Sequence, residues 1–523
     1  MTKARQEHQK HQARAVVIGA GYAGLASAIL LAQDGYAVRV VEKLAQPGGR
    51  AESISEQGFR WDTGPSWYLM PEAYEHFFRL CGTDIANECE LVELSPAYRV
   101  FSGTERSCDV HAGVDNVAEL FENIEPGAGA KIRAYLAQAT QVYQLALETF
   151  LYTTFSSIAP LLRLKILSRV HWLVAGISRS IEHKTNRIVA HPLLRQILQY
   201  PAVFLSSQPA QTPALYALMS HTDLVEGPRY PQGGFAAISA ALWRIAQENG
   251  VEFSFNTEVT AIETVHKQVR GVRSIRGELF DADLVVHAGD IRHCELELLQ
   301  PEQRSYPERY WQRAHPGVSA VIIMLGVRGE LPQLVHHNLL FSPDWEPDFH
   351  AIYTGAHPER PDRISESLYV CKPSHTDPTV APAGHENLFI LVPAPAEECY
   401  GHGSAFGGQE SEWVSHVVRN TIARLAHWAN IPDLAQRIVV QKTIGPADYA
   451  QRYHSWSAGA IGRAHTPRQS AFLRGKNVSA KVDGLYYAGA STVPGVGVPL
   501  CLISAENVLK RIHGDSSSRP FSY

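Results

Sequence analysis

Cysteine is scarce and scattered in this sequence. The seven cysteines form no C-x-x-C pair and no metal-like cluster with the 24 histidines. Only His336 and His337 are adjacent, and neighbours on a strand point to opposite faces, which argues against a metal site. We therefore expect no metal, and we expect reduced, mostly structural thiols of a cytosolic protein. The cysteines are Cys81, Cys89, Cys108, Cys294, Cys371, Cys399 and Cys501.

Long apolar runs are missing as well. No uninterrupted run is long and apolar enough to span a bilayer, and residues 1–14 lack the apolar centre of a signal peptide. There are no internal repeats and no low-complexity segments. The net charge of −5 gives no reason to expect nucleic acid as a partner. With 523 residues, the chain is long enough for two domains, consecutive or interleaved.

The stretch 15–50, AVVIGAGYAGLASAILLAQDGYAVRVVEKLAQPGGR, predicts a nucleotide-binding βαβ unit. An apolar strand precedes the glycines, a helix of small residues follows them, and a second strand ends at Glu42. Gly19 permits the tight turn, Gly21 lets the backbone approach a pyrophosphate, and Gly24 lets helix and strand pack closely. The helix N-terminus offers free N–H groups to phosphates. Glu42 is placed to accept hydrogen bonds from ribose hydroxyls.

This fingerprint alone does not choose between NAD and FAD. The segment Gly48-Gly49-Arg50 favours FAD, because it is similar to the segment that lies along the FAD pyrophosphate in glutathione-reductase-like flavoproteins. The alternative is an ordinary turn with a solvated Arg50. The tail, residues 484–512, predicts a strand, a Gly/Pro-rich loop and a helix from Leu500. Its glycines permit close approach to a flat ring, and its helix N-terminus can face a flavin.

The order of these segments predicts an α/β fold. In it, a Rossmann-like FAD-binding domain alternates with a substrate domain of mixed sheet plus helices. We expect the FAD-binding domain to comprise residues 14–75, 227–290 and 476–514, and the substrate domain to comprise 76–226 and 291–475. Further predicted helices are 126–150 and 236–249, and predicted strands are 251–255, 259–262, 269–274, 278–280, 284–286, 318–327 and 388–392.

The segment 149–222 differs from the rest in composition, since Glu182 is its only acid. Between Leu161 and Ile181, leucine, isoleucine and valine share one helical face, while Lys165, Arg169 and Arg179 share another. A basic amphipathic helix with tryptophan and leucine fits a membrane surface. The alternative is a helix that packs its apolar face on the core of the substrate domain. Both interpretations can hold for neighbouring faces.

The chain resembles the bacterial-type carotenoid desaturases, such as phytoene desaturases, over nearly its whole length. The resemblance rests on the fingerprint with Glu42 and Gly48-Gly49-Arg50, and on five further motifs. These are FRWDTGPSWYLMP at 59–71, YPQGGF at 230–235, VVHAGD at 285–290, SHTDPTVAP with GHEN at 374–387, and GASTVPGVGVP at 489–499. In VVHAGD, His287 and Gly289 stand where relatives often have serine and alanine.

The resemblance implies a glutathione-reductase/amine-oxidase-like fold, non-covalent FAD, a lipid-facing entrance and a long apolar tunnel ending at the flavin. The implied reaction removes a hydride and a proton from neighbouring carbons of phytoene, stepwise toward neurosporene or lycopene. It implies a peripheral membrane protein, while the electron acceptor, oxygen or a quinone, stays open. The residues expected at FAD are Gly19, Ala20, Gly21, Gly24, Glu42, Lys43, Gly49, Arg50, Val259, Gly489, Ala490, Gly497 and Val498.

Several alternatives stay open at this point. The protein chemistry needs no catalytic triad, because the cofactor carries the reaction, and no spacing selects an acid–base residue. His465 and Asp448 are both conceivable helpers. A carotenoid isomerase, a ketolase or a diapophytoene desaturase would share the same motifs. A more distant alternative is a prenyl-lipid escort without redox chemistry, against which the intact fingerprint and the tail argue.

Overall fold

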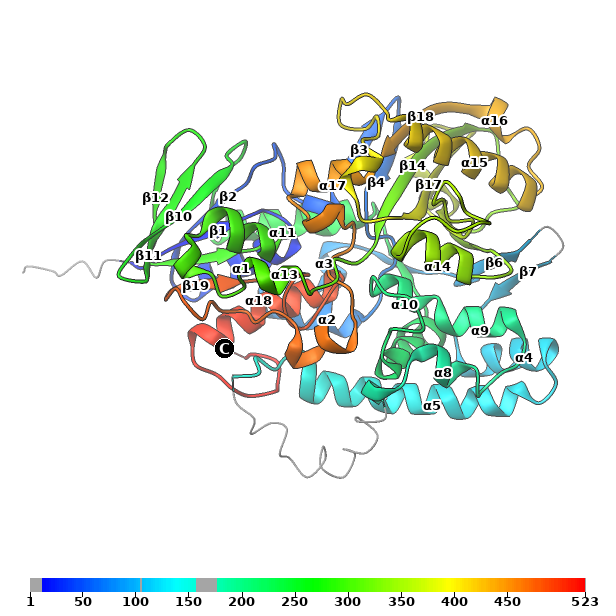
Figure 1. Ribbon diagram of the computed structural model, residues 1–523, viewed down its shortest axis with the longest axis horizontal. Coiled ribbons are helices and arrows are strands. Elements are labelled where there is room, and N and C mark those ends of the chain that lie inside the picture. Colours follow the sequence, from blue (N-terminus) through cyan, green and yellow to red (C-terminus); the bar gives the residue numbers. More distant parts are fainter. Residues whose placement is uncertain (1–11, 104–105, 157–175, 523) are drawn as a thin grey trace, which may run out of the picture.

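A computed structural model describes residues 12–103, 106–156 and 176–522. Two lobes lie side by side in Figure 1, one built on a five-stranded sheet and the other on a seven-stranded sheet. This arrangement confirms the predicted α/β fold. In the part of the chain that the structure describes, no helix has the length and apolar character needed to cross a membrane.

The first lobe contains a parallel sheet assembled from three distant parts of the sequence. Its strand order is β19-β13-β1-β2-β9, and all neighbouring pairs are parallel. The strands are β1 (Arg14–Ile18), β2 (Ala37–Val41), β9 (Glu252–Ser254), β13 (Leu284–His287) and β19 (Leu485–Tyr487). The helices α1 (Tyr22–Gln33), α11 (Phe235–Glu248) and α18 (Val498–Ile512) pack together beside it (Figure 1).

Small elements complete this lobe. An antiparallel sheet contains β10 (Val259–Val265), β11 (Gln268–Ser274) and β12 (Leu279–Asp281), which correspond to the strands predicted at 259–262, 269–274 and 278–280. The other small elements of this part of the chain are two antiparallel strand pairs and four helices: β3 (Ser53–Glu56) with β4 (Phe59–Asp62), β5 (Leu91–Glu93) with β8 (Arg229–Pro231), α2 (Pro71–Leu80), α3 (Ile85–Glu88), α12 (Ile291–His293) and α13 (Glu308–Trp311). The tail helix α18 begins at Val498, two residues before the predicted start, because a proline is tolerated in the first turn.

The second lobe is organised around the mixed sheet β18-β14-β17-β16-β15-β6-β7. Its strands are β6 (Tyr98–Ser102), β7 (Arg106–Val110), β14 (Ser319–Arg328), β15 (His337–Phe341), β16 (Leu368–Cys371), β17 (His385–Ala394) and β18 (Ile438–Ile444). Alternate residues of β14 face opposite sides. Val321, Ile323 and Leu325 share a buried cluster with α15 (Glu412–Trp428), whereas Ile322 and Met324 share another with the helical layer on the other face.

The helical layer lies at the lower right of Figure 1. It contains α4 (Val114–Ile124), α5 (Ala128–Ala146), α8 (Ile181–Thr185), α9 (Pro192–Gln199) and α10 (Pro201–Phe204). The predicted helix 126–150 is therefore α5, and a π-helical turn, Leu147–Leu151, continues it. The predicted amphipathic helix Leu161–Ile181 lies mostly outside the described residues, so its two interpretations stay predictions.

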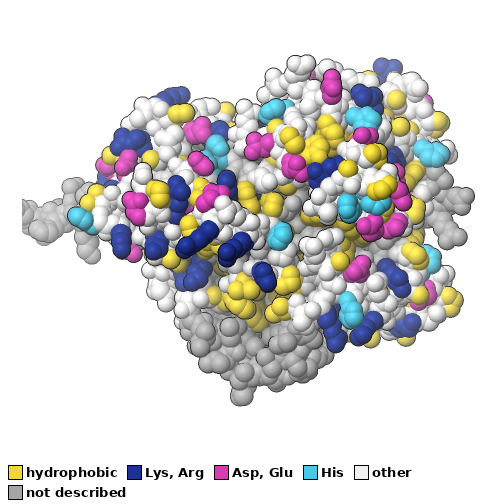
Figure 2. All heavy atoms as spheres, in the orientation of Figure 1, with side chains coloured by type: hydrophobic (Ala, Val, Ile, Leu, Met, Phe, Trp, Pro, Cys, Tyr) yellow, Lys and Arg dark blue, Asp and Glu magenta, His cyan; other side chains and the backbone are white. Residues whose placement is uncertain are grey.

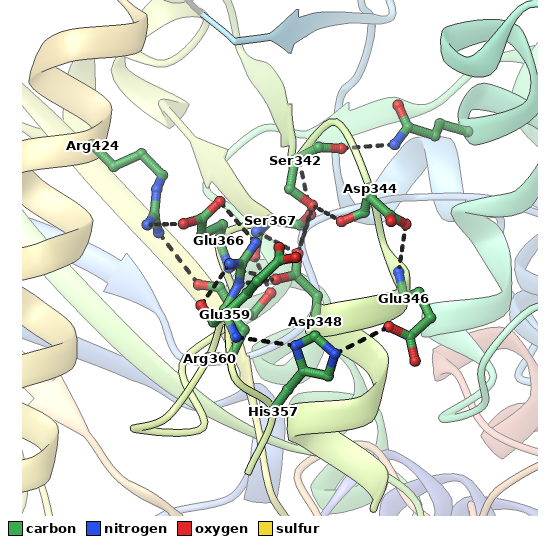
Figure 3. A network of polar contacts seen from close by, with 12 residues as sticks. Ser342, Asp344, Glu346, Asp348, His357, Glu359, Arg360, Glu366, Ser367 and Arg424 are labelled. Atoms are coloured by element: carbon green, nitrogen blue, oxygen red, sulfur yellow. Dashed lines mark hydrogen bonds and ion pairs between the residues drawn. The ribbon is translucent and has the colours of Figure 1, made fainter. Parts of the chain in front are cut away.

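A buried polar network fastens α14 (Glu346–Tyr353) to the rest of the second lobe (Figure 3). Arg360 donates a hydrogen bond to the Asp348 carboxylate over 2.8 Å and forms an ion pair with Glu366 over 2.8 Å. Ser342 and Ser367 also donate to Asp348. The charges of Asp348 and Arg360 are buried and paired with each other, as buried charges must be. The remaining short helices of this lobe are α16 (Leu434–Arg437) and α17 (Pro446–Tyr453).

Replacing Asp348 with alanine tests this network. The change removes the buried carboxylate that pairs with Arg360 and leaves this guanidinium with only the partly exposed Glu366, so we expect a loss of about 3–5 kcal/mol in unfolding free energy. The exposed pair of Asp433 with Arg437 provides the control, because its loss is expected to cost less than about 1 kcal/mol. Denaturant unfolding of both variants measures the difference. Equal losses of unfolding free energy in the two variants would show that the network does not stabilise the second lobe more than an exposed ion pair does.

Candidate cofactor and substrate site

The turn between β1 and α1 has the geometry that a bound pyrophosphate requires. Gly19 has a φ of +100°. A Cβ atom on Gly24 would lie 1.9 Å from the Gly19 carbonyl oxygen, so only glycine lets the helix pack on this turn. A Cβ on Gly21 would meet only the Gly48 oxygen, at 4.0 Å. Gly21 is the N-cap of α1, and the space beside it belongs to a large cavity.

Glu42 is held in place at the end of β2. Its carboxylate accepts hydrogen bonds from the backbone N–H of Ala20 over 2.6 Å and of Leu44 over 2.7 Å. Burial raises the pKa of Glu42, and these two donors oppose the rise. An ionised carboxylate has about four acceptor positions, so two remain for the two hydroxyls of a ribose. Glu42 also lines the cavity.

The segment Gly48-Gly49-Arg50 closes over the same turn. Gly48 and Gly49 have φ values of +120° and +57°, and the Gly48 N–H donates to Ala20 over 3.0 Å. The Arg50 guanidinium donates to the Ile461 carbonyl over 2.9 Å and to the Ser455 hydroxyl over 3.2 Å. Arg50 is therefore not a solvated turn residue, since it joins the nucleotide-binding turn to a segment 400 residues further along.

The tail brings a second helix N-terminus to the same place. Gly497 has a φ of +111° and is the N-cap of α18. Gly489 has a φ of +104°, and its N–H donates to the Ser504 hydroxyl over 2.9 Å. Because α18 packs directly on α1, both helix N-termini border one cavity. Their N–H groups and positive dipole ends suit a cofactor that is anionic in the middle and electron-rich at one end.

A cavity of about 780 Å³ connects these elements. Among the thirteen residues predicted at FAD, eleven line it. Ala20 and Gly24 do not: Ala20 fixes Glu42 through its N–H, and Gly24 packs under Gly19. The lining residues are Gly19, Gly21, Glu42, Lys43, Gly49, Arg50, Val259, Gly489, Ala490, Gly497 and Val498. The donor set and the missing Cβ atoms fit a dinucleotide.

Polar residues near Lys43 and Val259 were not predicted. Glu258, His293 and His454 line the cavity there. The rings of His293 and His454 stack at 3.9 Å between centroids, and the Lys43 ammonium lies 3.1 Å from the His454 Nε2 atom. Burial is the main cause that lowers the pKa of both histidines. These residues come from three separate elements, so no spacing in the sequence brings them together.

Beyond the nucleotide end, the cavity continues into the second lobe with a largely apolar wall. The wall combines α5, the turn after it, the segment following α10, and strands of the mixed sheet. Its members include Val142, Leu145, Ala146, Phe150, Leu151, Phe204, Leu205, Leu215, Leu218, Met219, Ile322 and Leu391. An apolar channel that opens at a nucleotide site matches the predicted tunnel in chemical character.

The two conceivable helpers have different surroundings. His465 lines the cavity, and its Nδ1 atom lies 3.0 Å from the Leu205 carbonyl oxygen. A carbonyl oxygen only accepts, so Nδ1 carries the proton and Nε2 keeps its lone pair. Burial lowers the pKa of His465 well below its ordinary value. Asp448 instead accepts from the N–H groups of Gly403 and Gly445, both over 2.7 Å, and does not line the cavity.

The adjacent histidines do not point apart as predicted. His336 precedes β15, which begins at His337, so the period-two rule of a strand does not apply to the pair. The ring centroids lie 4.6 Å apart, and both side chains are buried.

The comparisons with known proteins define the class. Residues 22–513 match the family described as flavin containing amine oxidoreductase. In fold, the chain is similar to an oxidoreductase from Methanosarcina mazei (TM-score 0.63, 17% identity, 95% of this chain and 100% of that one) and to putrescine oxidase (TM-score 0.60, 14% identity, 97% and 99%).

Two relatives are much more similar in sequence. A carotenoid 3,4-desaturase from Haloarcula japonica is 37% identical over 95% of this chain and 98% of its own length. A zeta-carotene-forming phytoene desaturase from Myxococcus xanthus is 32% identical over 95% and 93%. The chain therefore belongs to the flavin-containing amine oxidoreductases and, within them, to the FAD-dependent carotenoid desaturase family. The predicted family, the FAD cofactor and an oxidoreductase acting on CH–CH groups are thereby confirmed.

Replacing Glu42 with alanine tests the nucleotide end. The change removes charge-assisted hydrogen bonds worth about 1.5–3 kcal/mol, so we expect FAD to bind roughly 10- to 150-fold more weakly. Equilibrium titration of the deflavinated protein with FAD measures this affinity. As a control, Asp34→Ala removes a carboxylate at the other end of α1 and should leave the affinity unchanged. Unchanged FAD affinity in a folded Glu42→Ala protein would contradict the assignment.

Proposed function

We propose that this protein dehydrogenates an acyclic carotenoid inside the apolar part of the cavity. The observation that carries the proposal is the continuity of one cavity, from the predicted FAD residues to a wall of leucine, isoleucine, valine and phenylalanine. A hydrocarbon gains about 0.8 kcal/mol for each CH₂ group that leaves water. The names of the relatives supply the class of substrate, since both act on carotenoids.

The protein residues position the chain and accept its proton. FAD, when bound, accepts a hydride from one carbon. The neighbouring carbon must then lose a proton, so that a C–C single bond becomes a double bond. We assign the proton to the Nε2 lone pair of His465, the neutral imidazole that lines the cavity. A strongly lowered pKa does not disqualify this imidazole, because a proton beside a carbon that has lost a hydride is very acidic.

Two reactions compete within this class. The sequence motifs predicted stepwise desaturation of phytoene toward neurosporene or lycopene, and the Myxococcus relative supports that reaction. Desaturation at the 3,4 position, near one end of the chain, is supported by the Haloarcula relative, whose identity is higher at 37% against 32%. We favour 3,4-desaturation on this difference. In both reactions oxygen or a quinone would serve as the final electron acceptor.

Substrate oxidation by the FAD-loaded protein tests the proposal. Without oxygen, the protein is mixed with liposomes that contain phytoene, lycopene or a 1-hydroxylated acyclic carotenoid. We expect the flavin absorbance to bleach with lycopene or with the 1-hydroxylated carotenoid. The mass of that carotenoid should fall by two hydrogens per flavin. Loss of hydrogen from phytoene alone would favour the phytoene reaction. An unchanged mass would indicate an isomerase or an escort, and a gain of oxygen in air would indicate a ketolase.

We further propose that the protein takes its substrate from a membrane surface. Phe472 and Leu473 are 54% and 49% exposed, and Ile177 is 38% exposed. Phe472 and Ile177 also line the cavity, so apolar surface is exposed at its edge. Figure 2 shows hydrophobic side chains gathered at the lower part of one face, below a row of lysines and arginines. Such a surface suits the headgroup region of an anionic bilayer.

The double change Phe472→Ser with Leu473→Ser tests this proposal. We expect weaker binding to anionic liposomes and slower oxidation of carotenoid in liposomes, while FAD content stays unchanged. The matched control is Val265→Ser with Ile275→Ser, which removes apolar side chains that are 47% and 64% exposed on the small antiparallel sheet. Liposome flotation measures binding. Equal binding by both double variants would place the membrane-facing surface elsewhere.

A further inference from the structure

Three buried side chains with metal-binding atoms meet at the start of β15 and the end of β16. His336, His337 and Cys371 each offer one ligand atom, and these atoms lie within 4.8 Å of one another. The side chains are 1%, 0% and 2% exposed. His337 and Cys371 are direct partners across the antiparallel β15–β16 pair, so their side chains leave the sheet on the same side. The N–H of Lys372 donates to His336 over 2.8 Å and fixes the third residue beside them.

Each of the two imidazole rings is oriented by one hydrogen-bond partner, but its second nitrogen has none. One nitrogen of each ring has a partner: His336 Nδ1 lies 2.7 Å from the Thr376 hydroxyl, and His337 Nδ1 lies 2.7 Å from the Tyr369 hydroxyl. The Nε2 atoms of both rings are buried and have no hydrogen-bond partner. Buried polar atoms are nearly always paired, so two orphaned nitrogens beside a thiol require an explanation.

We propose that His336, His337 and Cys371 bind a divalent transition-metal ion, which by ligand type is Zn²⁺. Imidazole and thiolate are the ligands that zinc prefers in proteins. The hydroxyls of Thr376 and Tyr369 contact the other nitrogen of each ring and so fix its orientation toward the metal. Each histidine donates a lone pair, and Cys371 binds as thiolate and releases its proton to solvent.

The surroundings agree with this assignment. Zinc bonds are about 2.0–2.3 Å long, so binding tightens the three ligand atoms by roughly 1 Å. A small cavity of about 20 Å³, lined by Cys371 and Asp62 but by neither histidine, has room for one water beside the thiol.

The proposed metal site contacts residues that form the wall of the substrate cavity. The Trp67 ring stacks on His337 at 4.4 Å between centroids, and the Tyr369 hydroxyl bonds both His337 and Ser66. Trp67, Ser66 and Tyr369 all line the large cavity. A metal ion on His337 therefore fixes the wall against which the carotenoid lies. The site itself is independent of which carotenoid is the substrate.

Metal analysis of the FAD-loaded protein tests the proposal. The protein is isolated without chelators from cells supplied with zinc, and metal, flavin and polypeptide are quantified in the same sample. We expect about one zinc per chain, and zinc-edge X-ray absorption should show one sulfur and two imidazole nitrogens. Cys371→Ser should lose the metal. The matched control Cys294→Ser removes another fully buried thiol and should keep it.

A further variant covers the case in which Cys371→Ser fails to fold. Thr376→Val keeps all three ligands but removes the hydroxyl that orients His336, so we expect zinc to bind about 10- to 100-fold more weakly. Competition with a chromophoric chelator measures that affinity. A wild-type protein that stays metal-free after incubation with Zn²⁺ would overturn the proposal and leave a buried water as the partner of the two nitrogens. Equal zinc content in Cys371→Ser and wild type would also overturn it.

Discussion

The contact between Gly24 and the Gly19 carbonyl is the constraint on which the cofactor site depends. With a Cβ atom at Gly24 only 1.9 Å from that oxygen, any other residue would push α1 away from β1. The position of α1 sets the position of its N-terminus at Gly21, and α18 packs on α1 more extensively than any other helix does on its neighbour among the described residues. The position of the second helix N-terminus, at Gly497, therefore depends on the position of α1. The absence of a side chain at Gly24 thus allows both helix N-termini to face the same cavity.

The nucleotide end could be predicted from sequence because its chemistry is local. The turn, the helix N-terminus and Glu42 lie within 24 residues, and backbone geometry alone brings them together. The contacts of individual residues were harder to predict. Gly24 and Ala20 support the site without lining it, and Arg50, which was predicted at the cofactor, also donates a hydrogen bond to the distant Ile461 carbonyl. Long-range hydrogen bonds of this kind leave no periodic signal in a sequence.

The substrate end could be predicted only through family resemblance. Its wall is made by residues from α5, the segment after α10 and the mixed sheet, and apolar residues of this kind are what any protein core contains. Only the structure shows that their side chains surround a cavity and do not fill it. The prediction that His336 and His337 point to opposite faces was wrong for a different reason. The period-two rule presumes that both residues belong to the strand, but β15 begins at His337, and a boundary error of one residue reverses the expected direction of a side chain.

Burial shifts the pKa of several interior groups in one direction, toward the neutral form. It lowers the pKa of His337 and His465 and raises the pKa of Glu42 and Asp62, so each group shifts toward its neutral form. For a hydrocarbon substrate this is the appropriate setting, because an apolar chain gains nothing from a charged wall and charges would hold water in the cavity. In the proposed dehydrogenation, charge would form on the substrate if the hydride left before the proton. A nearby lone pair would stabilise that charge strongly in a cavity of low polarity. The neutral imidazole of His465, which donates at Nδ1 to a carbonyl and keeps Nε2 free, would meet both needs in this proposal, because it leaves the resting cavity uncharged and would take the proton only when the substrate has become acidic.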